Sequence, residues 1–117
     1  MATRPAISII IPVYNVERWI RRAVSSLQRQ TFENFELLLV DDGSTDASGS
    51  ICDELAGGDS RIRVIHQENA GAARARNAGI AEARGEFLYF MDGDDWCEPS
   101  MLENMHRTAS AHALDLV

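Results

Sequence analysis

Two groups of carboxylates, Asp41-Asp42 and Asp92-Gly93-Asp94-Asp95, are the residues best placed to do chemistry. Each group directly follows a short apolar run that is typical of a buried strand. Aspartate oxygens are ligands that Mg²⁺ and Mn²⁺ favour, and Mg²⁺ is often held by one or two carboxylates together with substrate phosphates. Because five carboxylates at one edge would repel each other without a cation or hydrogen-bond donors, we interpret Asp92 and Asp94 as a metal site for a diphosphate.

Aspartates in these positions are also common turn formers and helix caps. Residues 44–46 (Ser-Thr-Asp) suit the start of a helix, so Asp46 is better explained as a cap, while Asp41 fits either role. In the second group, Gly93 would let the backbone turn tightly enough for both neighbouring aspartates to face one ligand.

The hydrophobic pattern predicts the elements that carry these groups. Apolar runs predict strands, and apolar residues at steps of three and four predict helices between them. The expected strands are 7–11, 35–40, 63–65 and 87–91, with a fifth beginning at 113–117; the expected helices are 16–27, about 44–55, 72–83 and about 99–111.

This alternation is typical of an α/β, Rossmann-like, mostly parallel sheet in three α/β/α layers. Ligands bind outside the carboxyl ends of the strands in such sheets, where both aspartate groups would lie. The pattern stops inside an expected strand, so we expect residues 1–117 to be a fragment of a larger domain.

Four single positions carry further expectations. Pro12 should close the first strand, and Asn15 should cap the first helix. Trp19 falls on the apolar stripe of that helix and is expected in the core. Gly85 is placed for the C-terminal cap of the third helix.

Composition excludes several classes of function. With 45% apolar and 25% charged residues the chain is ordinary for a globular domain, and its net charge of −7 argues against a nucleic-acid binder. All 11 basic residues are arginine, which excludes a Walker-type phosphate loop and a lysine Schiff base. No apolar run approaches the ~18 residues of a transmembrane segment. Cys52 and Cys97 lack metal-site spacing, which favours free thiols and leaves a lone disulfide open.

Four segments, in order and over nearly the whole chain, resemble the family 2 inverting glycosyltransferases. They are Ile7–Asn15 (ISIIIPVYN), Phe35–Asp46 (FELLLVDDGSTD), Asn69–Gly79 (NAGAARARNAG) and Gly85–Asp95 (GEFLYFMDGDD). The resemblance implies a GT-A fold whose N-terminal half binds a nucleotide-sugar donor, with UDP preferred ahead of dTDP and GDP.

Site residues follow from the same resemblance. It implies that Asp42 accepts a hydrogen bond from the base, and that Asp92 faces the ribose or the metal. Asp94 would ligate Mg²⁺ or Mn²⁺, and the role of Asp95 is open. The full expected donor site is Pro12, Val13, Tyr14, Asn15, Asp42, Arg76, Asp92, Gly93 and Asp94.

The resemblance also limits what this chain should do. The metal would stabilise the leaving nucleoside diphosphate, while the catalytic base of the family and most of its acceptor site are expected beyond Val117. We therefore expect the 117-residue chain to bind nucleotide and to transfer sugar poorly or not at all. The sequence leaves the acceptor open among a glycan, a lipid-linked precursor and a protein, with polysaccharide biosynthesis as the expected process. The expected location is the cytoplasm or the inner face of a membrane.

Other interpretations are weaker or remain open. A nucleotide-binding module without catalysis fits the fragment. A phosphoacceptor receiver domain does not, because the chain has no lysine and no acidic pair after the first strand. No GxGxxG follows that strand, which argues against a nicotinamide-binding domain. Trp96 would pack beneath the acidic loop or against an acceptor sugar, and the histidines are interpreted as structural or solvated.

Overall fold

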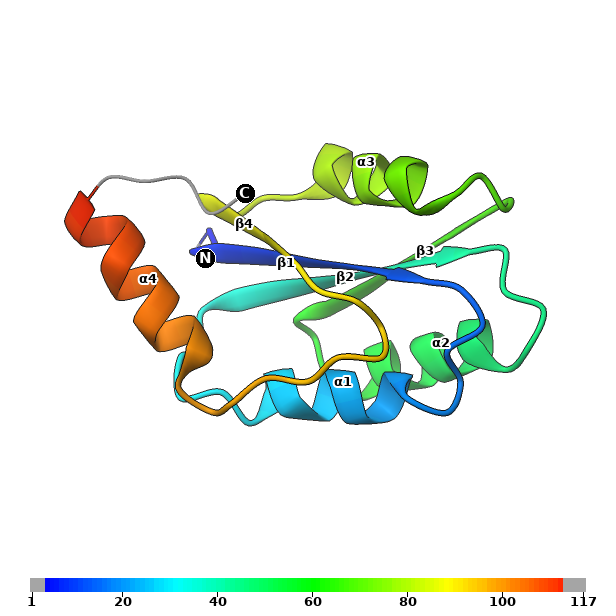
Figure 1. Ribbon diagram of the computed structural model, residues 1–117, viewed down its shortest axis with the longest axis horizontal. Helices are drawn as coiled ribbons and strands as arrows, with labels where there is room; N and C mark the ends of the chain where they lie inside the picture. The colour runs from blue at the N-terminus through cyan, green and yellow to red at the C-terminus, as the bar shows by residue number, and fades with distance from the viewer. Residues whose placement is uncertain (1–3, 113–117) are drawn as a thin grey trace.

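Strands and helices alternate along the chain in the computed structural model, which describes residues 4–112 (Figure 1). Their order is β1 (Ile7–Val13), α1 (Ile20–Gln28), β2 (Phe35–Asp42), α2 (Ser48–Gly58), β3 (Ile62–Gln67), α3 (Ala72–Glu82), β4 (Phe87–Phe90) and α4 (Met101–His112). The expected strand at 113–117 lies outside the described residues.

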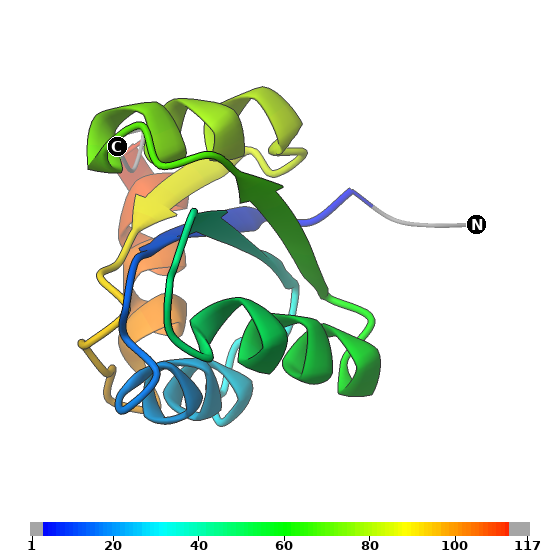
Figure 2. The same cartoon turned by 90° about the vertical axis from the view of Figure 1, so that its right-hand side faces the viewer.

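The four strands form one sheet in the order β3-β2-β1-β4, and every neighbouring pair is parallel. Helix α3 covers one face of the sheet, α1 and α2 cover the other, and α4 lies beside the amino ends of the strands (Figures 1 and 2). The expected α/β fold with a parallel sheet between helical layers is therefore confirmed.

Side-chain alternation along the strands divides the core in two. Ile7, Ile9 and Ile11 pack with α1 and α2, while Ile10 packs with Ala75 of α3. All four isoleucine side chains are fully buried, as expected for a central strand covered on both faces. The positions of the helices against the sheet are fixed by these two apolar layers.

Strands β1 and β2 are longer than the sequence predicted. Pro12 lies inside β1, paired in register with Val40, and so does not close the strand. The carbonyl of Ile10 accepts a hydrogen bond from Met91 N, so the backbone of every second residue of β1 faces β4. Pro12 has no N–H, but β4 has ended by the level of Pro12. The proline therefore breaks no hydrogen bond of the ladder between β1 and β4.

Asn15 does not cap α1, contrary to the sequence prediction. The helix begins at Ile20 with Trp19 at its N-cap, and no side-chain capping bond is present. Asn15 has a φ of 51°, and its Oδ1 accepts hydrogen bonds from the backbone N–H groups of Thr45 and Asp46 at 2.8 and 3.2 Å. It joins the loop after β1 to the loop after β2.

Two further expectations are wrong. Trp19 is 39% exposed, because it precedes the first helical residue and the helical periodicity does not extend to it. Gly85 is not the cap of α3, whose C-cap is Ala83. Instead Gly85 N donates to Ser8 Oγ at 2.8 Å, and a Cβ on Gly85 would lie 2.6 Å from Ser8 N.

Two smaller expectations can also be assessed. Cys52 and Cys97 are both buried free thiols, so the disulfide alternative is excluded. Burial, with nearby acidic residues, raises the pKa of Cys52 to about 12. Within residues 4–112, no helix combines the length and apolar character needed to cross a membrane.

Candidate functional site

Asp41 and Asp42 end β2 and point to opposite faces of the sheet, because successive strand residues alternate. Their β3 partners in register are His66 and Gln67. Asp41 and His66 therefore turn toward α2, and Asp42 and Gln67 turn toward α3. The strand pattern thus sends the two carboxylates of one acidic pair into different surroundings.

The Asp42 carboxylate organises the loop that precedes α3. Its Oδ1 accepts hydrogen bonds from Gln67 Nε2 at 2.9 Å and Ala70 N at 2.8 Å. Its Oδ2 accepts from Asn69 Nδ2 at 3.2 Å and Gly71 N at 3.0 Å. Burial would raise the pKa of Asp42, but hydrogen bonds from Gln67, Ala70 and Gly71 outweigh burial and hold the pKa below its ordinary value. Asp42 is therefore ionised and firmly held.

Asp41 belongs to a different cluster on the α2 face. His66 Nδ1 lies 2.8 Å from Asp41 Oδ2, and His66 Nε2 lies 2.8 Å from Asp53 Oδ1 on α2. A neutral imidazole donates through only one nitrogen, so this geometry favours the imidazolium. Hydrogen bonds to Asp41 and Asp53 accordingly raise the pKa of His66. The sequence left Asp41 open between a ligand-site carboxylate and a structural residue, and in the structure Asp41 has a structural role.

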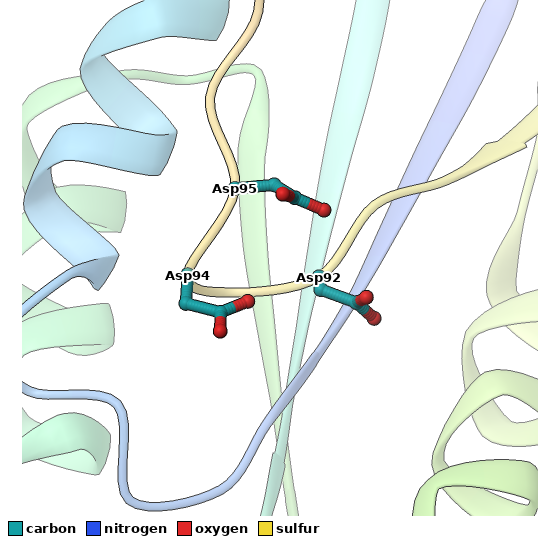
Figure 3. A group of neighbouring side chains, drawn as sticks. All are labelled: Asp92, Asp94 and Asp95. Atoms are coloured by element: carbon teal, nitrogen blue, oxygen red, sulfur yellow. The ribbon is translucent and has the colours of Figure 1, made fainter.

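The second acidic group forms a tight turn after β4, which we call the acidic turn (Asp92–Asp95). Asp95 N donates to Asp92 O at 3.1 Å, and the carboxylates of Asp92, Asp94 and Asp95 each place an oxygen within 4.8 Å of the others. Figure 3 shows the three aspartates following one another around the bend. Three exposed carboxylates fit a hard cation such as Mg²⁺ or Mn²⁺.

Gly93 is needed in the acidic turn for a reason other than the one predicted. It is not among the residues with positive φ. It is buried, and a Cβ there would lie 2.9 Å from Val16 Cγ2. Close packing against the loop after β1, rather than an unusual backbone conformation, requires glycine here.

An open hollow of about 310 Å³ lies at the carboxyl ends of the strands; we call it the carboxyl-end hollow. Arg76 on α3 reaches across its edge, with Nη2 3.9 Å from Asp92 Oδ1. Arg76 borders the hollow, whereas Arg74, two residues earlier on α3, does not. Its lining comprises Pro12, Tyr14, Val16, Asp42, Asn69, Gly71, Ala72, Arg76 and Asp92.

The hollow gathers five of the nine residues expected in the donor site, namely Pro12, Tyr14, Asp42, Arg76 and Asp92. Asp94 lies beside it in the acidic turn. The side chains of Val13 and Asn15 lie elsewhere: Val13 is in the core on the α1 and α2 face, and Asn15 binds the loop after β2.

Sequence reasoning did not assign Gln67 to Asp42, and the expected site left out four residues that line the hollow, namely Val16, Asn69, Gly71 and Ala72. The pairing register of β3 with β2 would have identified Gln67 as a neighbour of Asp42, because the two residues are direct partners in the sheet. Trp96 is 60% exposed, so it does not pack beneath the acidic turn.

Comparison with known proteins places this geometry in a family. The model of "Glycosyl transferase family 2" matches residues 8–117. Among curated proteins, the uncharacterized glycosyltransferase EpsJ of Bacillus subtilis is 47% identical over 113 residues, which cover 97% of this chain and 33% of EpsJ.

Solved structures agree with the fold. S. aureus TarS, crystallised as residues 1–349 with UDP, superposes with a TM-score of 0.85 at 31% identity, covering 92% of this chain and 33% of that crystallised fragment. The mannosyltransferase PcManGT of Pyrobaculum calidifontis, in complex with GDP-Man and Mn²⁺, gives a TM-score of 0.73 at 26% identity, covering 80% of this chain and 29% of that one. The chain thus spans about a third of the length of EpsJ and of each of the two crystallised chains.

Proposed function

Because the chain belongs to glycosyl transferase family 2, we propose that it is the donor-binding part of an inverting glycosyltransferase that uses a UDP-sugar. The observation that carries the proposal is the carboxyl-end hollow, which is lined by Asp42, Arg76 and Asp92, the first residue of the acidic turn. TarS supports the choice of nucleotide, since its structures contain UDP and UDP-GlcNAc.

In this proposal the base lies in the carboxyl-end hollow, beside Tyr14, Pro12 and Asp42. All four hydrogen-bonding positions on the Asp42 carboxylate are already used within the chain. A base N–H would therefore replace the amide of Gln67 or Asn69, because a side-chain amide can turn aside while the backbone donors stay. Asp42 would select an N–H donor, as uracil presents.

The acidic turn would hold the diphosphate through a divalent cation. Asp92 and Asp94 would be its ligands, and Asp95 offers a third oxygen. When bound, the cation would supply Lewis-acid stabilisation of the charge on the leaving diphosphate. Arg76 is placed to add a positive charge on the α3 side. PcManGT supports this role for the turn, because its structure contains Mn²⁺.

The proposal assigns donor binding, and no proton transfer, to the described residues. We propose that the 117-residue chain alone binds nucleotide without transferring sugar, since it spans about a third of the length of its relatives. The acceptor would be a glycan or a lipid-linked precursor, and the enzyme would work in the cytoplasm or at the inner face of a membrane.

Calorimetric titration of UDP, in Mn²⁺ and again in EDTA, tests donor binding. We expect binding that depends on Mn²⁺, with Asp94→Asn weakening it by roughly tenfold or more. Glu86→Gln is the matched control, because it changes the same charge at an exposed site at the other end of β4. Equal UDP affinity in Mn²⁺ and in EDTA would show that the acidic turn does not take part in UDP binding through a cation.

Two further arms complete the test. GDP titrated under the same conditions should bind more weakly than UDP, and the reverse order would refute the UDP preference. Release of UDP from UDP-GlcNAc, followed with a glycan present, should stay at background. Turnover by the isolated chain would contradict the binding-only role.

A further inference from the structure

A second and larger hollow opens on the α1 face, between α1 and residues 96–99; we call it the arginine hollow. Its volume is about 770 Å³, and Arg21, Arg22, Arg29 and Trp96 border it. Among the described residues that line it none is acidic, although the chain as a whole carries a net charge of −7. This local reversal of charge favours an anionic ligand.

The two walls of the arginine hollow are tied together by side chains of α1 and of the residues just after it. Ser26 Oγ accepts a hydrogen bond from Cys97 N at 3.1 Å. Gln30, two residues past the end of α1 and only 5% exposed, accepts a hydrogen bond from Leu102 N at 2.9 Å. These bonds hold the segments on either side of the hollow together without a ligand, which lowers the cost of binding.

Its positive charge is only partly compensated. Arg21 pairs with Glu54, and both side chains are exposed. Arg22 Nη2 donates to the neutral carbonyl of Asp94 at 3.1 Å, so the charge of Arg22 is not cancelled by that bond. Arg29 is exposed and forms no ion pair with any residue between 4 and 112. Two guanidinium groups thus remain available to an anion.

The arginine hollow lies across the acidic turn from the carboxyl-end hollow. One is bordered by α1 and the other by α3, on opposite faces of the sheet (Figure 1). Figure 3 shows the acidic turn between these two helices. A donor with its base on the α3 side and its diphosphate at the turn would extend its sugar toward the α1 side. A ligand in the arginine hollow would lie next to that sugar.

We propose that the arginine hollow binds the acceptor and that the acceptor is an acidic saccharide. Arg22 and Arg29 would hold its carboxylate or phosphate groups, because guanidinium forms strong paired hydrogen bonds with both. Trp96, 60% exposed at the rim, would pack its flat apolar ring against a sugar ring. The role as acceptor site rests on the proposed donor function, while the binding of an acidic saccharide does not.

The indole N–H resonance of Trp96 gives a direct readout. The chain has two tryptophans, so Trp19→Phe assigns the remaining resonance to Trp96. A glucuronic acid–N-acetylglucosamine tetrasaccharide and glucose 6-phosphate are the acidic probes, and a neutral N-acetylglucosamine tetrasaccharide is the comparison. We expect a saturable shift of the Trp96 resonance with at least one acidic probe, and which one responds identifies carboxylate or phosphate.

Arg29→Gln should weaken that binding by about tenfold, the loss expected for one charge-assisted hydrogen bond. Arg18→Gln is the matched control, because Arg18 is exposed, carries the same charge and does not line the hollow. No shift with either acidic probe, or an equal shift with the neutral one, would overturn the proposal. So would binding only to anionic phospholipid vesicles, or to a second copy of the chain.

This titration needs neither nucleotide nor metal, so its result can be separated from the donor test. If UDP binds and no acidic saccharide does, the acceptor inference fails alone. If an acidic saccharide binds and UDP does not, the proposed donor function fails and the hollow loses its role as an acceptor site.

Discussion

Replacing Asp42 with asparagine should destabilise the fold far more than its small change in size suggests. Four donors converge on the carboxylate, two at each oxygen, and Asp42 is only 3% exposed. Asparagine keeps one acceptor oxygen and turns an NH₂ group toward the other two donors. Two hydrogen bonds to a charged acceptor are lost, at about 1.5 kcal/mol each.

The loss of unfolding free energy is therefore about 3 kcal/mol, less whatever the Gln67 and Asn69 amides recover by turning to water. Urea unfolding followed by circular dichroism measures it, and the midpoint should fall by about 1 to 2 M. The lowered pKa of Asp42 adds a pH signature. Its contribution is complete above the unfolded pKa and is lost as the pH falls through the folded pKa, so Asp42→Asn should flatten the acid side of the stability curve.

Asp94→Asn is the control for this experiment, because it makes the same substitution at an exposed residue of the acidic turn. Its urea midpoint should match that of the unmodified chain. If Asp42→Asn unfolds at the same urea concentration as Asp94→Asn, the four hydrogen bonds do not support the loop before α3, and the account of Asp42 is refuted.

Two other substitutions test separate parts of the structure. The raised pKa of His66 means that its bridge between Asp41 and Asp53 stabilises fully below the unfolded pKa, ordinarily near 6.5. This stability is lost as the pH rises through the folded pKa of His66. In the unmodified chain the unfolding free energy, measured with urea, should therefore fall over this pH range, and in His66→Gln it should not. An equal fall in both proteins would exclude the bridge. Gly43→Ala should lower the unfolding free energy by about 1 kcal/mol or more, since Gly43 has a φ of +68° and a Cβ there would lie 2.6 Å from Asn69 N; an unchanged midpoint would show that this loop relaxes.

The sequence was enough to predict the fold, and that fold brings five of the nine expected site residues to one hollow. Buried strands such as 35–42 are short apolar runs, and they contrast with the helical spacing of residues 20–27. Both patterns depend on residues close in the chain. The rule that parallel strands place their carboxyl ends at one edge then brought Asp42 and Asp92 to the same hollow.

What the sequence did not predict depends on contacts between distant segments. The bond from Asn15 to Thr45 spans 30 residues, and no local pattern distinguishes it from a helix cap. The four hydrogen bonds to the Asp42 carboxylate depend on the pairing register of β3 and on the position of the loop at 69–71. The arginine hollow needs α1 packed against residues 96–99, and only the tertiary structure brings these together.

The most direct test of the donor site is paramagnetic broadening of amide resonances by Mn²⁺ in the ¹⁵N-labelled chain with UDP. The account predicts that the amides of Asp94 and Asp95 broaden first, those of Tyr14 and Gly71 next, and that Arg61 at the start of β3 stays sharp. EDTA should restore every signal. Broadening centred on the His66 cluster, or spread evenly over the chain, would contradict the claim that the acidic turn and the carboxyl-end hollow form one metal-dependent nucleotide site.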